Sequence, residues 1–385
     1  MNGYPLEGVR VLDLTQYVAG PYCTQVLADL GATILKVERP NGGDVYRRQG
    51  PVFANGESAS FLTLNRGKRS IRLDLGVERD RARLHELVAE ADVLVENMRP
   101  GALARHGLDY GSLAERHPRL VYCSISAYGQ TGPLAAAGGY DVTIQALSGL
   151  MAMTGHPGQP PAKIPIAALD FGGALYAAVG ILAALAQRER TGRGQWVQTS
   201  LLETALAWLS MHIVTFLLGG GEPEPLGTRS PFFAPYEAYH TADGYLVLVG
   251  TGGRDAWGAL CTTLGLERLR EDERFATNSD RVRNAEELRV ELEAVLSTRP
   301  TAEWVEPLER AGVACAPVER LSQVLASEQV RVLGMVGTLE HPGAGAVPAV
   351  RLPLTLSGAP TLAAAPPPLL GADDQVGFGT APTPA

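Results

Sequence analysis

The chain has 385 residues and a formal net charge of −8, from 33 lysines and arginines against 41 aspartates and glutamates. Apolar residues make up 45% and charged residues 19%, which excludes wholesale disorder and allows a sizeable core. The mild acidity argues against nucleic acid or an anionic membrane as a partner, because neither surface attracts an acidic protein. At about 150 residues per domain, the length indicates two to three domains, or one large domain with an insertion.

The first half of the chain alternates between short β-branched runs and segments of helical periodicity. Strands are predicted at residues 9–14, 32–37, 70–75, 92–96, 120–126 and 195–198. Helices are predicted up to Leu30, over residues 77–90, and around Ala102 and Leu113. Such alternation is typical of βαβ units, so we expect an α/β fold with a mainly parallel sheet.

Residues 171–186 form an apolar stretch without a single charge. The stretch is shorter than the roughly 20 residues of a membrane span, and Gly172, Gly173 and Gly180 interrupt it. We therefore interpret it as a buried helix. A further long apolar helix is expected to end at Leu218.

The second half opens with a change of composition. Residues 219–235 are rich in Gly and Pro, which is typical of a linker. Thr-Ala-Asp-Gly at 241–244 separates two strand-like runs, and this pattern predicts a hairpin over residues 236–249. The remaining expectations are helices near Trp257 and over 286–296 and 302–311, antiparallel strands over 333–357, and a mobile tail from Ala363.

Several familiar motifs are missing from the sequence. The turn after Leu14 holds one glycine instead of GxGxxG, which argues against a nicotinamide cofactor. No GxSxG is present, and the seven histidines lack metal-ligand spacing, so no metal site is predicted. The four cysteines lie far apart without a CxxC pair, which favours a reduced, cytoplasmic protein without zinc or disulfides.

Asp170 is the candidate for chemistry, because it immediately precedes the apolar helix. One interpretation is structural: an aspartate there can act as the N-cap of the helix. The other is catalytic, with the carboxylate as a nucleophile on an activated acyl group. Gly172 and Gly173 favour a close approach by a ligand or another backbone, since each costs roughly 1 kcal/mol relative to alanine in a helix. Both roles can hold together.

The run Asn-Arg-Gly-Lys-Arg-Ser at 65–70 gathers three cations just before a strand. Such a run is usually a solvated loop. With Arg39, Arg99 and Arg105 it could instead bind phosphates, because an acidic protein needs a local basic pocket for an anionic ligand.

Taken together, these segments resemble the class III CoA-transferase family, which includes formyl-CoA transferase, carnitine CoA-transferase and α-methylacyl-CoA racemase. The resemblance follows the family's order along nearly the whole chain. The matching segments are 6–14 (LEGVRVLDL), 19–21 (AGP), 30–40 (LGATILKVERP), 43–44 (GD), 65–70 (NRGKRS), 92–97 (DVLVEN), 100–101 (PG), 139–141 (GYD), 145–146 (QA), 148–149 (SG), Asp170, 180–185 (GILAAL), 191–195 (TGRGQ), 200–201 (SL) and 369–374 (LLGADD).

The resemblance implies a Rossmann-like large domain with a parallel sheet, plus a smaller α+β domain, in an interlocked homodimer. Residues 1–218 would begin the large domain, 219–235 would link, 236–330 would form the small domain, and 331–385 would return to complete the large one and end in a mobile tail. Acyl-CoA and small carboxylic acids would be the substrates, with no tightly bound cofactor.

The resemblance also implies a mechanism and a set of site residues. Asp170 would attack an acyl-CoA thioester and form an aspartyl-acyl anhydride and then an aspartyl-CoA thioester, which an acceptor carboxylate attacks. The residues expected to bind CoA, with the cations facing phosphates, are Val18, Ala19, Arg39, Lys68, Leu73, Asn97, Met98, Arg105 and Tyr140.

Some departures from the family pattern bear on which reaction is expected. Racemase relatives have histidine where this chain has Tyr140, and a phenol with a pKa of about 10 is a poor acid-base group for racemisation. Epimerisation therefore stays as the alternative, together with a non-catalytic CoA-binding homologue. The family's glycine-rich lid is reduced to Gly-Thr-Gly-Gly at 250–253, and Val18 and Gln49 replace the glutamine and tryptophan of formyl-CoA transferase, so oxalate is not predicted.

Overall fold

The computed structural model describes residues 3–251, 255–358 and 365–379 and divides the chain into two compact units. The large unit comprises Met1–Met151, Lys163–Glu222 and Leu333–Ala385, and the small unit comprises Ala152–Ala162 and Pro223–Val332. Residues 152–162 were expected to belong to the large domain. The structure assigns this segment to the small unit, where the Gly227 amide donates to the Gly155 carbonyl at 2.7 Å.

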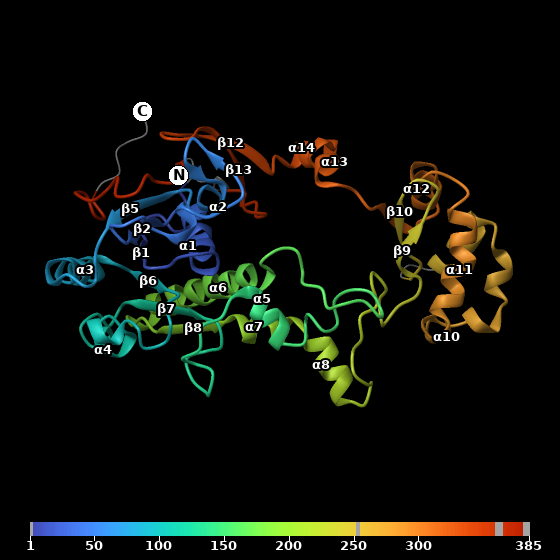
Figure 1. The fold of residues 1–385 in the computed structure, drawn as a ribbon, viewed down its shortest axis with the longest axis horizontal. Helices are drawn as coiled ribbons and strands as arrows, with labels where there is room; N and C mark the ends of the chain where they lie inside the picture. Colours follow the sequence, from blue (N-terminus) through green and yellow to red (C-terminus); the bar gives the residue numbers. More distant parts are fainter. Residues whose placement is uncertain (1–2, 252–254, 359–364, 380–385) are drawn as a thin grey trace. The chain divides into compact units, whose positions relative to one another are not determined.

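A six-stranded parallel sheet forms the centre of the large unit (Figure 1). Its strands, given in sheet order, are β5 (Lys68–Arg72), β2 (Thr33–Glu38), β1 (Arg10–Asp13), β6 (Val93–Glu96), β7 (Val121–Ser126) and β8 (Trp196–Ser200). The chain runs outwards from β1 in both directions, as in doubly wound folds. The strand order therefore reverses between β1 and β6, which is where such sheets bind ligands.

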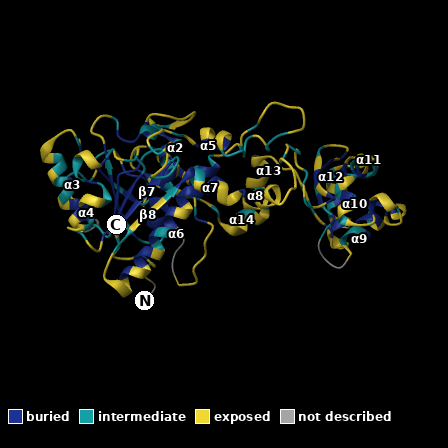
Figure 2. Cartoon of the chain, turned by 90° about the horizontal axis from the view of Figure 1, so that it is seen from below, coloured by how far each residue is buried: buried dark blue, intermediate teal, exposed yellow. Residues whose placement is uncertain are grey.

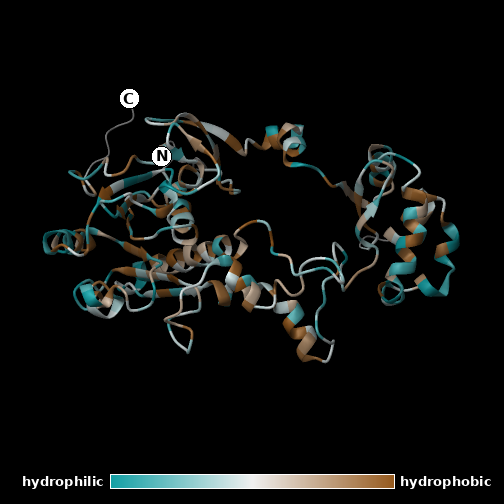
Figure 3. Ribbon diagram, viewed as in Figure 1, coloured by the Kyte–Doolittle hydropathy of each residue, from teal (hydrophilic) through white to brown (hydrophobic). Residues whose placement is uncertain are grey.

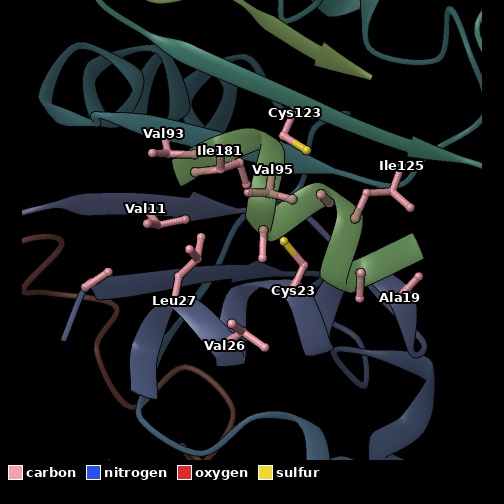
Figure 4. Close-up of a cluster of buried hydrophobic side chains, with 14 of the residues drawn as sticks. Val11, Ala19, Cys23, Val26, Leu27, Val93, Val95, Cys123, Ile125 and Ile181 are labelled. Atoms are coloured by element: carbon pink, nitrogen blue, oxygen red, sulfur yellow. The ribbon is translucent and has the colours of Figure 1, made fainter. Parts of the chain in front are cut away.

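Helices cover both faces of the inner strands, which explains why these strands are rich in apolar residues, whereas the edge strands β5 and β8 are more polar. On one face, α1 (Ala19–Asp29) and α6 (Ala168–Thr191) share a core with Val11, Val95 and Cys123 of the strands (Figure 4). On the other face, α3 (Glu78–Glu90) and α4 (Tyr110–Ala114) pack on alternate strand residues such as Leu12 and Leu94. Figure 2 shows the interior of the sheet as buried, and edge strand β8 and parts of α3 and α4 as exposed.

Helix α6 is long and apolar enough to cross a membrane by length and composition alone, with a mean hydropathy of 1.8, but half of that stretch is buried within the protein. Its glycines allow this close packing. A Cβ on Gly172 would lie 2.3 Å from the Trp208 ring, and one on Gly180 would lie 2.5 Å from Val197. The apolar segment after β8 was expected to be one helix; it forms α7 (Leu201–Trp208) and α8 (Ser210–Leu217) instead, with a break at Leu209.

Shorter elements complete the large unit. They are η1 (Val45–Arg47), β3 (Phe53–Ala54), β4 (Glu57–Ser58), α2 (Ala59–Leu64), η2 (Ala104–His106), α5 (Asp141–Leu147) and the hairpin of β12 (Val336–His341) and β13 (Gly345–Val350).

The C-terminal segment was expected to be mobile from Ala363. Residues 365–379 instead lie along β5, where the backbone of Ser70 exchanges hydrogen bonds with Asp373 and the Arg72 side chain pairs with Asp374. Residues 380–385 lie outside the described residues.

The small unit is built on an antiparallel sheet of β9 (Tyr236–His240), β10 (Tyr245–Val249) and β11 (Ala314–Pro317), in the order β11-β10-β9. Its helices are α9 (Ala256–Leu264), η3 (Glu267–Arg270), η4 (Glu273–Phe275), α10 (Asn278–Arg283), α11 (Ala285–Leu296), α12 (Thr301–Arg310), α13 (Leu321–Ala326) and α14 (Glu328–Leu333). Leu246, Leu292 and Trp304 belong to a core separate from those of the large unit. Residues 252–253, half of the glycine run at 250–253, lie outside the described residues.

Candidate active site

A cavity of about 440 Å³ opens at the switch point of the sheet. Its walls come from the loops that follow parallel strands: Gln16 and Tyr17 after β1, residues 97–100 after β6, and residues 125–127 at the end of β7. The glycine-containing segment 137–140 and Asp170, in the first turn of α6, complete the lining.

A second cavity, of about 740 Å³, lies beside the first at the ends of β2 and β5. The residues that line both cavities are Arg39, Met98, Ala102 and Arg105. The second cavity also has an apolar wall, formed by Leu14, Val37, Leu73, Leu75 and Leu103. The two cavities thus form a path that leads from an apolar chamber, past arginines, to a carboxylate.

Hydrogen bonds between backbone and side chain fix the switch point itself. The Asn97 amide donates to the Gln16 carbonyl at 2.7 Å, and the Gln16 N–H donates to the Asn97 Oδ1 at 3.0 Å. This reciprocal pair ties the loop after β1 to the loop after β6. Asn97 was expected to bind a ligand, and the structure gives it this bracing contact as well.

The N-cap interpretation of Asp170 is wrong. The carboxylate that caps α6 belongs to Asp141 of α5, whose Oδ2 accepts from the N–H groups of Leu169 at 2.7 Å and Asp170 at 3.2 Å. Gln145 donates to the other oxygen of Asp141, and its Oε1 accepts from the Ile164 N–H at 2.9 Å. This chain of contacts positions the start of α6. The Asp170 side chain is therefore not used for capping.

Asp170 has an unusual acidity as a result. Burial, with the negative charge of Asp141 as a second cause, raises the pKa of Asp170 from 3.8 to about 7. No side chain among the described residues forms a hydrogen bond with the Asp170 carboxylate. A desolvated carboxylate without partners is a stronger nucleophile than a solvated one, because no hydrogen bond has to be broken before it attacks.

Three arginines around the cavity have no counter-ion. Arg39, Arg99 and Arg105 are exposed lining residues, and none of them forms an ion pair with a carboxylate in the part of the chain that the structure describes. Unpaired guanidinium groups that converge on a cavity favour an anionic ligand, above all a phosphate. The site is therefore locally basic in a chain with a net charge of −8.

The comparisons with known proteins agree with this geometry. A family model described as CoA-transferase family III matches residues 6–374. The chain belongs to this family.

Relatives with assigned reactions are similar over almost the whole chain. The succinyl-CoA:glutarate CoA-transferase of Mus musculus is 41% identical, covering 95% of this chain and 84% of the relative. The succinate–glutarate CoA-transferase of Agrobacterium fabrum is 39% identical, covering 95% and 93%. A solved CAIB/BAIF family protein from Brucella suis superposes with a TM-score of 0.85 at 38% identity, covering 97% of this chain and 98% of that one. The protein is a CoA-transferase of class III.

The CoA contacts that the resemblance to CoA-transferases implies are distributed unevenly over the two cavities. Ala19, Asn97 and Tyr140 line the first cavity, Leu73 lines the second, and Arg39, Met98 and Arg105 line both. Val18 is buried and lines neither.

Lys68 requires a correction, since it was expected to face a phosphate. Its ammonium is completely buried and donates to the Asp13 carboxylate at 3.1 Å, the Pro21 carbonyl at 2.9 Å and Asn65 Oδ1 at 2.9 Å. Burial lowers the pKa of Lys68 to about 8, whereas the lysine charges outweigh burial at Asp13 and hold the pKa of that carboxyl at about 2. The alternation of side chains along a strand could have predicted this burial. In β5, Lys68 and Ser70 are buried, whereas Arg69 between them is only half-buried.

Sequence reasoning missed Tyr17, Tyr46 and Asp141. Asp141 belongs to a segment noted only for its family resemblance, and its capping role depends on α5 and α6 meeting in the fold. Tyr17 lies in a loop and Tyr46 in the three-residue helix η1, which is too short to show periodicity, so no pattern in the sequence marked them. Within the described residues, no group of three or more His, Cys, Asp or Glu side chains is arranged to hold a metal ion.

Proposed function

We propose that the protein transfers coenzyme A from an acyl-CoA donor to a carboxylic acid through covalent intermediates on Asp170. The observation that carries the proposal is the Asp170 carboxylate itself. It is mostly desolvated, free of hydrogen bonds among the described side chains, and located in a cavity that unpaired arginines line. Family membership supports CoA transfer, and the geometry supports this residue as the nucleophile.

The two cavities suit the parts of a CoA molecule. The apolar wall of Leu14, Val37 and Leu73 offers a surface for the adenine ring, and Arg39 and Arg105 at the junction are placed to pair with phosphates. The pantetheine arm would then pass Met98 and Ala19, which line the first cavity with Asp170. This arrangement brings the thioester to the carboxylate.

The reaction divides into four exchanges at carbonyl carbons. A carboxylate oxygen of Asp170 attacks the carbonyl carbon of the donor thioester. The C–S bond breaks, CoA departs as the thiolate, and an acyl-aspartyl anhydride is formed. The thiolate attacks the aspartyl carbonyl and releases the donor acid, which leaves an aspartyl-CoA thioester. The acceptor carboxylate displaces the thiolate and forms a new anhydride. The thiolate then takes the acceptor acyl group and restores the Asp170 carboxylate.

The protein's contribution is to keep the acyl group activated while water is excluded. Both anhydride and thioester hydrolyse if water reaches them, and the buried first turn of α6 limits that access. The pKa of about 7 also means that the carboxylate is ionised and reactive at neutral to alkaline pH. Activity should therefore fall as the pH drops below about 7.

We propose succinyl-CoA as the donor and a short dicarboxylic acid as the acceptor. The support is the naming of the mouse and Agrobacterium relatives, which act on succinate and glutarate. Epimerisation is the alternative. It predicts uptake of deuterium at the α-carbon of a 2-methylacyl-CoA in heavy water, whereas CoA transfer predicts none.

The decisive experiment traps the intermediate. Wild-type protein incubated with succinyl-CoA and no acceptor is expected to gain the mass of one CoA less one water, and peptide mapping should locate this adduct on Asp170. Asp170→Ala should lose both the adduct and the CoA exchange, while Asp109→Ala, at an aspartate of the large unit outside both cavities, should keep them. Full activity of Asp170→Ala would exclude the proposed nucleophile.

We also propose that the protein is a homodimer. Helix α8 is apolar and has no buried residue (Figures 2 and 3). Its Met211, Val214 and Leu217 are 61%, 55% and 74% exposed. Exposed apolar residues on α6 and α7, such as Val179 and Trp208, extend this surface. Patches of this kind mark interfaces between proteins. Sedimentation should give a dimer for wild type and monomers for Val214→Glu, and a monomeric wild type would contradict the proposal.

A further inference from the structure

The loop between β1 and α1 contains a strained residue. Tyr17 has a φ of 68°, and the other non-glycine residues with positive φ in the described chain are Asn55 and Asp255. A bulky aromatic residue in this left-handed region costs roughly 1–2 kcal/mol, and such strain persists only where the surroundings enforce it. The neighbours of Tyr17 must therefore hold it in this conformation.

A buried ion pair holds the loop from behind. Lys36 and Asp44 pair at 2.9 Å with no exposed side-chain surface on either residue. The Lys36 ammonium donates to the Thr15 carbonyl at 2.7 Å, and Asp44 Oδ1 accepts from the Tyr17 N–H at 3.3 Å. The reciprocal bonds between Gln16 and Asn97 fix the residue in between. Every residue from 15 to 17 is therefore tied to a neighbouring loop or strand.

The constrained ring points to the cavity that contains Asp170. Tyr17 lines this cavity and packs edge-on against Tyr140, with ring centroids 5.9 Å apart, and against Tyr46, with centroids 5.8 Å apart. Asp44 fixes Tyr46 as well, because the same Oδ1 accepts from the Tyr46 N–H at 3.0 Å. Burial first, and then the charge of Asp170, raise the pKa of Tyr46. Tyr17 and Tyr140 thus form an aromatic wall of the cavity that contains Asp170, and Tyr46 supports it through its contact with Tyr17.

We propose that Tyr17 determines which acyl groups reach Asp170, and that Lys36 and Asp44 are positioning residues that hold its ring in place. A rigid aromatic wall favours a slim methylene chain and excludes a branched one, since the clustered rings cannot move apart without breaking their contacts. The acceptors selected are short, unbranched carboxylic acids. This inference rests on the proposed CoA transfer and adds the origin of its selectivity.

The test compares glutarate with 3,3-dimethylglutarate as acceptors, with succinyl-CoA as donor, by the ratio of their kcat/KM values. Wild type should prefer glutarate. Tyr17→Gly removes the ring and relieves the strain at φ 68°, so it should shift the ratio towards the branched acid by about tenfold or more. Tyr17→Phe should keep the wild-type ratio, as should Tyr245→Gly in the small unit. An unchanged ratio in Tyr17→Gly would overturn the inference.

The positioning role of Lys36 and Asp44 is tested by the same ratio of kcat/KM values, because a loss of stability alone does not change that ratio. Asp44→Asn keeps the size of the side chain and removes the ion pair, so the ratio should shift in the same direction as for Tyr17→Gly. Glu237→Gln removes an ion pair with Arg289 in the small unit, and the ratio should stay. A lower unfolding temperature of Asp44→Asn with an unchanged ratio would refute positioning. If that variant does not fold, the double variant Lys36→Met/Asp44→Asn, which leaves no unpaired charge, carries the same test.

The failure of this inference can be told apart from the failure of the proposed function. If wild type transfers CoA to neither acid nor to any other carboxylate, then the proposed function is wrong, and no acceptor ratio exists to compare between the variants. If wild type transfers CoA but Tyr17→Gly lowers kcat/KM for both acids by the same factor, then the ring supports catalysis in general and does not select the acceptor.

Discussion

The replacement of Asp170 by asparagine should stabilise the protein at neutral pH while it abolishes activity. Burial and the charge of Asp141 raise the pKa of Asp170 from 3.8 to about 7, so the folded protein resists ionisation of this group. Between these two values the folded state binds more protons than the unfolded state. The free energy of unfolding of wild type must therefore fall as the pH rises from about 4 to about 7. Asparagine has no such dependence.

The size of the effect follows from the shift. Each pKa unit corresponds to about 1.4 kcal/mol, so a shift of about 3 units sets an upper limit of about 4 kcal/mol. Because the carboxylate is partly open to the cavity, solvent screens some of this cost, and we expect an advantage of about 2 kcal/mol for Asp170→Asn at pH 8. For a unit of this size, that corresponds to a rise of roughly 4–8 °C in the unfolding temperature.

Thermal unfolding of wild type and Asp170→Asn at pH 4.5 and pH 8 measures this directly. The unfolding temperature of Asp170→Asn should exceed that of wild type by much more at pH 8 than at pH 4.5. Asp109→Asn, at an aspartate outside both cavities, should show no such change. Equal advantages for Asp170→Asn at both pH values would mean that the carboxylate is not held in a desolvated state. The account of its reactivity would then be wrong.

Five further variants have expected outcomes. Asp141→Asn keeps an acceptor for the start of α6 but removes a negative charge, so the acid limb of the pH profile of kcat/KM should move to lower pH. Gly172→Ala should destabilise the protein by about 1–3 kcal/mol in denaturant unfolding because its Cβ meets an indole ring, whereas Gly173→Ala should be neutral or stabilising. Lys68→Met should cost about 3–5 kcal/mol of stability, since it leaves a buried carboxylate unpaired. Arg39→Ala should instead raise KM for acyl-CoA about tenfold, more at low salt, with unchanged unfolding temperature.

The sequence predicted the parallel sheet well because both of its faces are buried. The inner strands β2, β1, β6 and β7 carry apolar residues on both faces, and the helices between the strands show their own periodicity. The segment after β8 shows the limit of such patterns. Its apolar residues predicted one buried helix, yet α8 is exposed, because periodicity records that a face is apolar and not what covers it.

The sequence grouped some of the candidate site residues correctly in space, and their roles stay predictions. Asp170, Arg39 and Arg105 meet at the cavity as the sequence suggested. Lys68 does not lie at the cavity. Side chains of a strand alternate between its two faces, and the Lys68 side chain lies on the face where it is buried against Asp13. Tyr17 owes its place to a backbone angle that contacts with Lys36, Asp44 and Asn97 impose, and no local pattern in the sequence predicts such contacts.

The strand at the sheet edge has a consequence for the order of folding. Ser70 and Arg72 of β5 find their partners in Asp373 and Asp374, about 300 residues later in the chain. During synthesis, the rest of the sheet can assemble long before the ribosome has made these partners. Until then β5 presents an unpaired edge, the feature that most readily recruits a strand from another chain. Premature termination near residue 365 should therefore leave an open edge and promote aggregation, even though every residue of the proposed active site is already present.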